Sequence, residues 1–163
     1  MHKPGHYGAA LLVYAPVGFL TLALGFDTVA VLGGAIAVGG AMVPDLDMRI
    51  PGVQHRGITH TVWFALVAGI VLGATGVALG SSSGALVAIG LGAFGFIVGV
   101  LTIGAHLLAD TLTPMGIRPL EPVDDREITL EIAKASNPLA NYALLALGIG
   151  ATGLATVAGQ AIV

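Results

Sequence analysis

The feature that most constrains this chain is a series of long apolar runs that contain no charged side chain. Five such runs occupy residues 9–25, 28–43, 61–79, 84–105 and 139–163. A helix needs about 20 apolar residues to cross a hydrocarbon layer about 30 Å thick, with about 17–25 as the usual range. Three of the runs meet this length, the first is at its lower limit, and 28–43 falls short of it. The runs predict a polytopic membrane protein.

Composition supports this interpretation. Only 9% of the 163 residues are charged and the mean hydropathy is +0.95, whereas soluble domains average about 25% charged residues. The chain has no cysteine, which excludes disulfides and thiolate metal ligands. Its few, dispersed cations give no support for nucleic-acid binding. We expect one integral membrane domain over residues 1–163, an all-α bundle of about five transmembrane helices in a lipid bilayer.

The segments between the runs define a topology. The turn Gly25-Phe26-Asp27 makes the first two runs a helical hairpin, in which 28–43 either spans the membrane or is tilted and partly re-entrant. Two polar loops, about 44–60 and 107–138, carry nearly every ionisable residue. Within the second loop, residues 127–134 are expected to form a short interfacial helix.

Charge then orients the bundle. Five helices place both polar loops on the same side as the amino terminus, and all six cations lie there: Lys3, Arg49, Arg56, Arg118, Arg126 and Lys134. Cytoplasmic loops of membrane proteins carry an excess of Lys and Arg. We therefore expect a multi-pass protein of the inner (cytoplasmic) cell membrane, with its amino terminus and both loops in the cytoplasm.

The same topology gathers all five histidines on the cytoplasmic side, where three aspartates at or near helix ends join them: His2, His6, His55, His60, His106, Asp45, Asp47 and Asp110. His106 and Asp110 are four residues apart, so they share one helix face. The aspartates of Pro44-Asp45-Leu46-Asp47 alternate, and in an extended turn alternate carboxylates converge on one point. Imidazoles and carboxylates without sulfur suit Zn²⁺, Mn²⁺ or Fe²⁺. The pattern favours a metal site.

Each motif by itself has a more ordinary explanation. A single His-x-x-x-Asp is more often a hydrogen bond at a helix end, Pro-Asp-Leu-Asp is more often a capped turn, and a lone histidine often lies among lipid headgroups. Those explanations give no reason for nearly all the histidines and three aspartates to collect at the ends of three helices. The combination therefore carries the prediction of a metal site.

Taken in order, these motifs resemble those of the membrane-bound metal-dependent hydrolases of the YdjM type. The matching segments are Pro44-Asp45-Leu46-Asp47, His55-Arg56-Gly57-Ile58-Thr59-His60-Thr61, and His106-x-x-x-Asp110 followed by Thr113-Pro114-x-Gly116. The resemblance covers about residues 1–122. That family has an earlier histidine, for which His6 is the best match and His2 a poorer one.

The family is in turn distantly similar to zinc-dependent phospholipase C, a helical bundle with a metal cluster. This likeness implies a metal held by His106 and Asp110, with Asp45 and His60 as companions. No histidine follows His106, so we expect one or two ions, zinc before manganese or iron, rather than three. The full set of expected ligands is His6, Asp45, His55, His60, His106 and Asp110.

The expected reaction is hydrolysis of a phosphoester in a lipid or another amphiphile. A bound metal lowers the pKa of water from about 15.7 towards about 7, and Asp47 could orient that water or take its proton. Arg56 and Arg118 could hold a phosphate, with Arg56 also near the reacting group, although both also suit ordinary membrane anchoring. Two alternatives remain: a metal-ion transporter, and a non-catalytic membrane protein with a structural metal.

Overall fold

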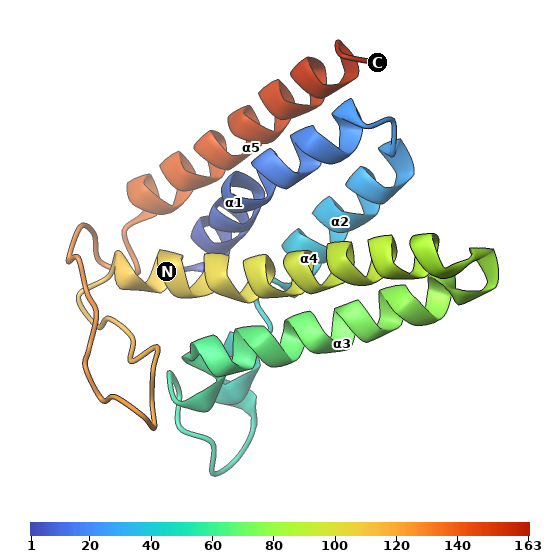
Figure 1. Ribbon diagram of the computed structural model, residues 1–163. Helices are drawn as coiled ribbons and strands as arrows, with labels where there is room; N and C mark the ends of the chain where they lie inside the picture. Colours follow the sequence, from blue (N-terminus) through green and yellow to red (C-terminus); the bar gives the residue numbers. More distant parts are fainter.

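The computed structural model describes residues 1–163 and contains five long α-helices and no β-strand (Figure 1). The helices are α1 (Lys3–Ala23), α2 (Asp27–Gly40), α3 (Val62–Gly80), α4 (Ala85–Thr111) and α5 (Pro138–Gln160). Three short 3₁₀ helices join them: η1 (Pro44–Arg49), η2 (Ile58–His60) and η3 (Ser81–Ser83). Five segments are long and apolar enough to cross a membrane, the second being α2 extended through η1 over Asp27–Arg49. The predicted all-α bundle is confirmed.

The bundle is assembled from two tightly packed pairs. Helix α3 packs along α4, α1 packs along α5, and α1 and α2 also contact α4 (Figure 1). Glycines allow the close approach: a Cβ at Gly99 would lie 2.6 Å from the carbonyl oxygen of Ala68, and one at Gly148 would collide with the backbone of Gly8. Small residues at such crossings are the usual means by which helices associate in lipid.

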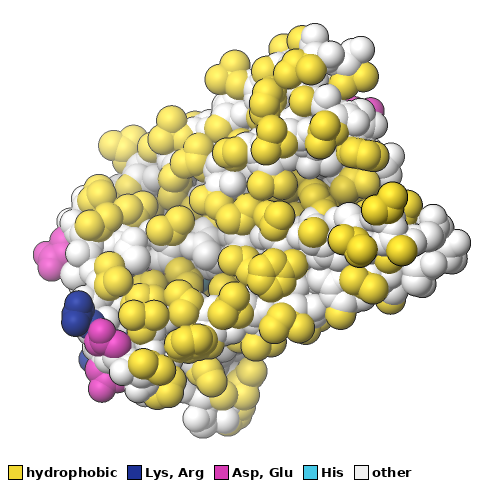
Figure 2. Space-filling model, viewed as in Figure 1, with side chains coloured by type: hydrophobic (Ala, Val, Ile, Leu, Met, Phe, Trp, Pro, Cys, Tyr) yellow, Lys and Arg dark blue, Asp and Glu magenta, His cyan; other side chains and the backbone are white.

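The amino terminus and both polar segments, residues 41–61 and 112–137, lie at one end of the bundle, here called the loop end (Figure 1). The turns between α1 and α2 and between α3 and α4 lie at the opposite end with the carboxyl terminus. On the face drawn in Figure 2, charged side chains gather at the loop end and apolar side chains cover the helices. This distribution suits a bundle surrounded by lipid.

Two boundaries differ from those expected. Helix α4 continues past its apolar run to Thr111, so His106 and Asp110 lie on the helix. The prediction of an interfacial helix at 127–134 is wrong. That segment is extended, and Ile128 forms an antiparallel bridge with Ile117. The Ile128 amide donates to the Ile117 carbonyl at 2.8 Å, and the Ile128 carbonyl accepts from the Ile117 amide at 3.1 Å. Those backbone groups are therefore not available to a helix.

Candidate metal centre

Four side chains from three separate elements meet at the loop end. Asp45 comes from η1, His60 from η2, and His106 and Asp110 from the last turns of α4. One ligand atom from each lies within 4.8 Å of all the others. The side chains of His60, His106 and Asp110 are almost wholly buried, whereas Asp45 is 11% exposed. The predicted convergence of distant imidazoles and carboxylates therefore exists in the structure.

The spacing of the donor atoms fits a small divalent cation. The Nε2 atoms of His60 and His106 are 3.1 Å apart, and Asp45 Oδ1 lies 3.5 Å from each of them. Asp110 Oδ2 lies 3.5 Å from His60 Nε2 and 3.6 Å from His106 Nε2. Ligands bound tetrahedrally at about 2.0–2.1 Å are separated by about 3.3–3.4 Å. The donor set could therefore hold a small divalent cation.

The second nitrogen of each imidazole has a partner that fixes its tautomer. His106 Nδ1 lies 2.7 Å from the carbonyl oxygen of Ala41, which can only accept, so Nδ1 carries the proton. His60 Nδ1 lies 3.0 Å from the Thr59 hydroxyl, which itself donates to Asp47 Oδ2 at 2.7 Å. In the neutral form of the two imidazoles, both Nε2 lone pairs are consequently directed at the centre, as in metal sites whose histidines are oriented by outer partners.

The carboxylates at the centre favour a positive charge on His60. Burial alone lowers the pKa of this imidazole, but hydrogen bonds and charge from Asp110 and Asp45 outweigh it, and the pKa is raised above its ordinary value. A bound cation would satisfy the same carboxylates.

His6 comes from α1 and lies at the edge of the four-donor group. Its ring stacks on His106 with centroids 3.9 Å apart, and its Nε2 is 3.6 Å from Asp110 Oδ1 and 3.9 Å from Asp45 Oδ2. Nε2 also donates to the Met1 carbonyl at 2.9 Å, and the Met1 amine binds Asp110. The buried Nδ1 of His6 has no hydrogen-bond partner. His6 is therefore next to the centre without completing the group.

Asp47 and His55 form a second group on the other side of His60. Asp47 accepts hydrogen bonds from His55 Nδ1 at 2.9 Å, from the Arg56 amide at 3.2 Å and from Thr59. Asp47, His55 and His60 could themselves hold an ion. The two aspartates of the Pro-Asp-Leu-Asp turn thus bracket His60, with Asp45 at Nε2 and Asp47 at Nδ1, and they do not converge on one point.

Arg56 joins the centre to a polar cavity. Its Nη2 lies 3.0 Å from Asp110 Oδ1 and its Nη1 donates to the Gly116 carbonyl at 2.6 Å. Its backbone adopts φ 62°, an uncommon value for a residue other than glycine. This conformation places the amide on Asp47 and the side chain on Asp110. The buried Nε of Arg56 has no partner.

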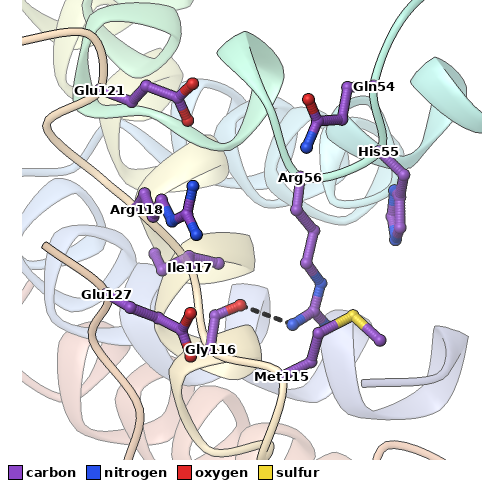
Figure 3. Close-up of a pocket in the computed structure, with 9 residues that line it drawn as sticks. All are labelled: Gln54, His55, Arg56, Met115, Gly116, Ile117, Arg118, Glu121 and Glu127. Atoms are coloured by element: carbon purple, nitrogen blue, oxygen red, sulfur yellow. Dashed lines mark hydrogen bonds between the residues drawn. The ribbon is translucent and has the colours of Figure 1, made fainter. Parts of the chain in front are cut away.

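Arg118 lines the cavity (Figure 3), and it takes no part in the ion pairs of the four-donor group. The cavity has a volume of about 220 Å³, and its charged lining consists of Arg56, Arg118, Glu121 and Glu127. Arg118 extends between the two glutamates, while Arg56 reaches towards Gly116 (Figure 3). Of the two predicted phosphate-binding arginines, only Arg56 contacts the candidate metal centre.

A family model described as YdjM inner membrane protein matches residues 1–162. The chain belongs to the YdjM inner membrane protein family. The predicted membership of the YdjM family is therefore confirmed, and the match extends well beyond the 122 or so residues that carried the resemblance. No curated protein and no solved structure matches the chain.

The three segments that carried the resemblance to the YdjM family are those that meet at the centre. Two threonines of these segments, for which the sequence favours helix capping over support of the ligands, also contribute to the centre. Thr59 links His60 to Asp47, and Thr113 donates to the Asp110 carbonyl at 2.8 Å while its oxygen lies 3.4 Å from Arg56 Nη1. Thr59 directly precedes His60 in the motif His-x-x-x-Thr-His, so its position next to an expected ligand could be read from the sequence.

Proposed function

We propose that this protein is a membrane-embedded metal-dependent hydrolase whose centre lies at the loop end of the bundle. The ion, which we expect to be zinc, is held by Asp45, His60, His106 and Asp110. His6 lies next to them and is a further possible ligand. The observation that carries the proposal is that every donor pair that includes the Nε2 of His60 or His106 is 3.1–3.6 Å apart. That spacing is close to the value for a tetrahedral site.

A divalent cation, when bound, supplies Lewis acidity and a lowered pKa for water. The side chains of the protein supply the positioning and a fixed positive charge. Asp47 and Thr59 hold the His60 ring in place, so we assign Asp47 a positioning role. Arg56 offers a fixed positive charge beside Asp110, with an unpartnered Nε–H. A planar guanidinium of this kind binds phosphate oxygens through paired hydrogen bonds.

The substrate we propose is the phosphoester of a lipid or a similar amphiphile. The centre lies where the apolar helices end and the polar loops begin, which is the position of a lipid headgroup. Arg118 and the cavity it lines would receive the polar part of such a molecule. We further propose that the loop end faces the cytoplasm, since all six cations lie in the segments that form it or next to them.

A structural metal is the second candidate. Structural zinc sites are closed by four protein ligands, whereas catalytic sites keep one position open, and the centre offers four donors. Asp45 is the most exposed of the four ligands, and it would have to leave the ion to open one coordination position. A transporter is not proposed, because the ligands lie at helix ends and not along the middle of the bundle.

The test is a metal analysis paired with an assay. Protein purified in nanodiscs is analysed for bound metal and for cleavage of phospholipid and lipid-phosphate substrates, before and after chelation. We expect metal and turnover in the wild type and neither in His106→Ala, with His2→Ala as the matched control because its side chain is exposed. Metal retention without turnover on any substrate would favour the structural role. Absence of bound metal from the wild-type protein would refute both the hydrolase and the structural-metal proposals.

A further inference from the structure

An apolar groove of about 520 Å³ runs between α2 and α3, with α4 as its floor. Both α2 and α3 pack on α4 but hardly contact one another, and the groove is the space left between them. Gly99 and Thr102 line this floor, and their small size leaves space above α4. The volume is within the range of about 300–1,000 Å³ that is usual for small-molecule sites.

The lining residues form helical stripes, so the groove is a continuous channel along the helices. On α3 the stripe is Phe64, Val67, Ala68, Val71 and Leu72, and on the second segment it is Ile36, Gly39, Gly40 and Val43. The stretch from Phe64 to Leu72 measures about 12 Å at 1.5 Å per residue. One leaflet contributes about 15 Å of a hydrocarbon layer about 30 Å thick. The groove is therefore about as deep as one leaflet.

One end of the groove lies next to residues that contact the candidate metal centre. Gly40 lines it, and the next residue, Ala41, accepts the hydrogen bond of His106. Thr102 lies one helical turn before His106 on the same face of α4. The groove also opens sideways to the surrounding lipid, since Val67 and Val71 are more than half exposed, at 54% and 58%. A lipid whose acyl chain lies in the groove would place its polar end next to the metal ligands.

We propose that this groove binds one acyl chain of the lipid substrate, which enters sideways from the leaflet at the loop end. The inference deepens the proposed hydrolase function and rests on it: the acyl chain would bring the phosphoester of the same lipid to the residues that would hold the cation and to Arg56. It predicts selectivity for phosphoesters that carry a long alkyl chain over those that have none.

Gly39 allows the groove to be filled without disturbing the fold. A Cβ at Gly39 meets no atom within 4 Å, and the residue lies on the groove wall. Leucine also has a higher helix propensity than glycine. Gly39→Leu should therefore fold and shorten the groove. Gly150→Leu is the matched control, because Gly150 on α5 is equally open and lies outside the groove.

The first readout is the ratio of kcat/KM for a long-chain phospholipid to that for a water-soluble phosphodiester without a chain. We expect Gly39→Leu to lower this ratio by about tenfold or more, the scale on which a single methylene changes kcat/KM in an apolar pocket. Gly150→Leu should leave it unchanged. An unaltered ratio in an active Gly39→Leu protein would overturn the proposal while leaving the hydrolase intact.

The second readout needs no turnover. A phospholipid with a photoreactive diazirine in its acyl chain is crosslinked to the full-length protein in nanodiscs, and the labelled residues are mapped by mass spectrometry. The groove should be labelled more than the apolar cavity lined by Leu24, Phe26 and Leu86 at the opposite end, and Gly39→Leu should abolish the excess. Equal labelling of both places would mean bulk lipid only and would overturn the proposal. Absence of any hydrolysis with preferential labelling would remove the hydrolase and keep the chain site.

Discussion

Replacement of Asp47 by asparagine tests how the centre is held together. Asp47 Oδ2 accepts the Thr59 hydroxyl at 2.7 Å and lies 3.4 Å from His60 Nδ1, while its other oxygen binds His55. Asparagine keeps the size but removes the negative charge that orients the His60 ring. Outer partners of this kind change metal affinity or activity by about 10–100-fold. We therefore expect Asp47→Asn to weaken metal binding by that factor, or about 1.4–2.8 kcal/mol.

The measurement is competitive metal titration of the nanodisc-embedded protein against a chromophoric chelator, with kcat determined at saturating metal. Asp125→Asn, an exposed change in the second loop, should leave the affinity unchanged, and Asp45→Asn should abolish stoichiometric binding. If Asp47→Asn keeps full affinity and loses kcat by about 10²–10⁴-fold, Asp47 is a general base and the positioning role is refuted. If neither quantity moves, Asp47 takes no part in the site.

Three further predictions follow from other contacts. Arg56→Lys should reduce kcat/KM for a phosphoester by about 10–100-fold while the metal content stays the same, because a lysine cannot reproduce hydrogen bonds to charged groups worth about 1.5–3 kcal/mol; steady-state kinetics with metal analysis checks this. Gly99→Ala should lower the thermal midpoint in detergent, since its Cβ would lie 2.6 Å from the Ala68 oxygen and overpacking costs about 1–3 kcal/mol; Gly150→Ala should not. Metal affinity should fall as the pH falls through the raised pKa of His60, because a proton on this imidazole must leave before the ion binds; calorimetry at several pH values that shows no such dependence would exclude His60 as a ligand.

The architecture was predictable because it depends on local properties. Apolar runs and the Gly25 turn define five helices without reference to tertiary contacts. The errors occur where tertiary contacts decide. The segment at 127–134 has apolar residues at suitable positions, but pairing of Ile128 with Ile117 takes the backbone groups that a helix would use. Helix α4 continues through two polar residues because both are buried against partners from other elements.

The site was predictable to a similar extent. His106 and Asp110 share a face by spacing alone, whereas the arrival of Asp45 and His60 beside them depends on how the loops fold back. The alternate carboxylates were expected to converge, as in an extended turn. The segment is instead a 3₁₀ helix, with about three residues per turn, so side chains two residues apart point in different directions. The contact of His106 with the Ala41 carbonyl could not be predicted, because the pattern of side-chain types carries no information about a backbone acceptor.

X-ray absorption spectroscopy at the metal edge of the purified protein tests most directly the claim on which both candidate functions depend, that the four side chains hold an ion. We predict one ion per chain with two imidazole nitrogens and two carboxylate oxygens at about 2.0–2.1 Å, and loss of the imidazole signal in His106→Ala. A protein that binds no divalent ion with all four side chains intact would contradict it, as would an ion whose spectrum is the same in His106→Ala.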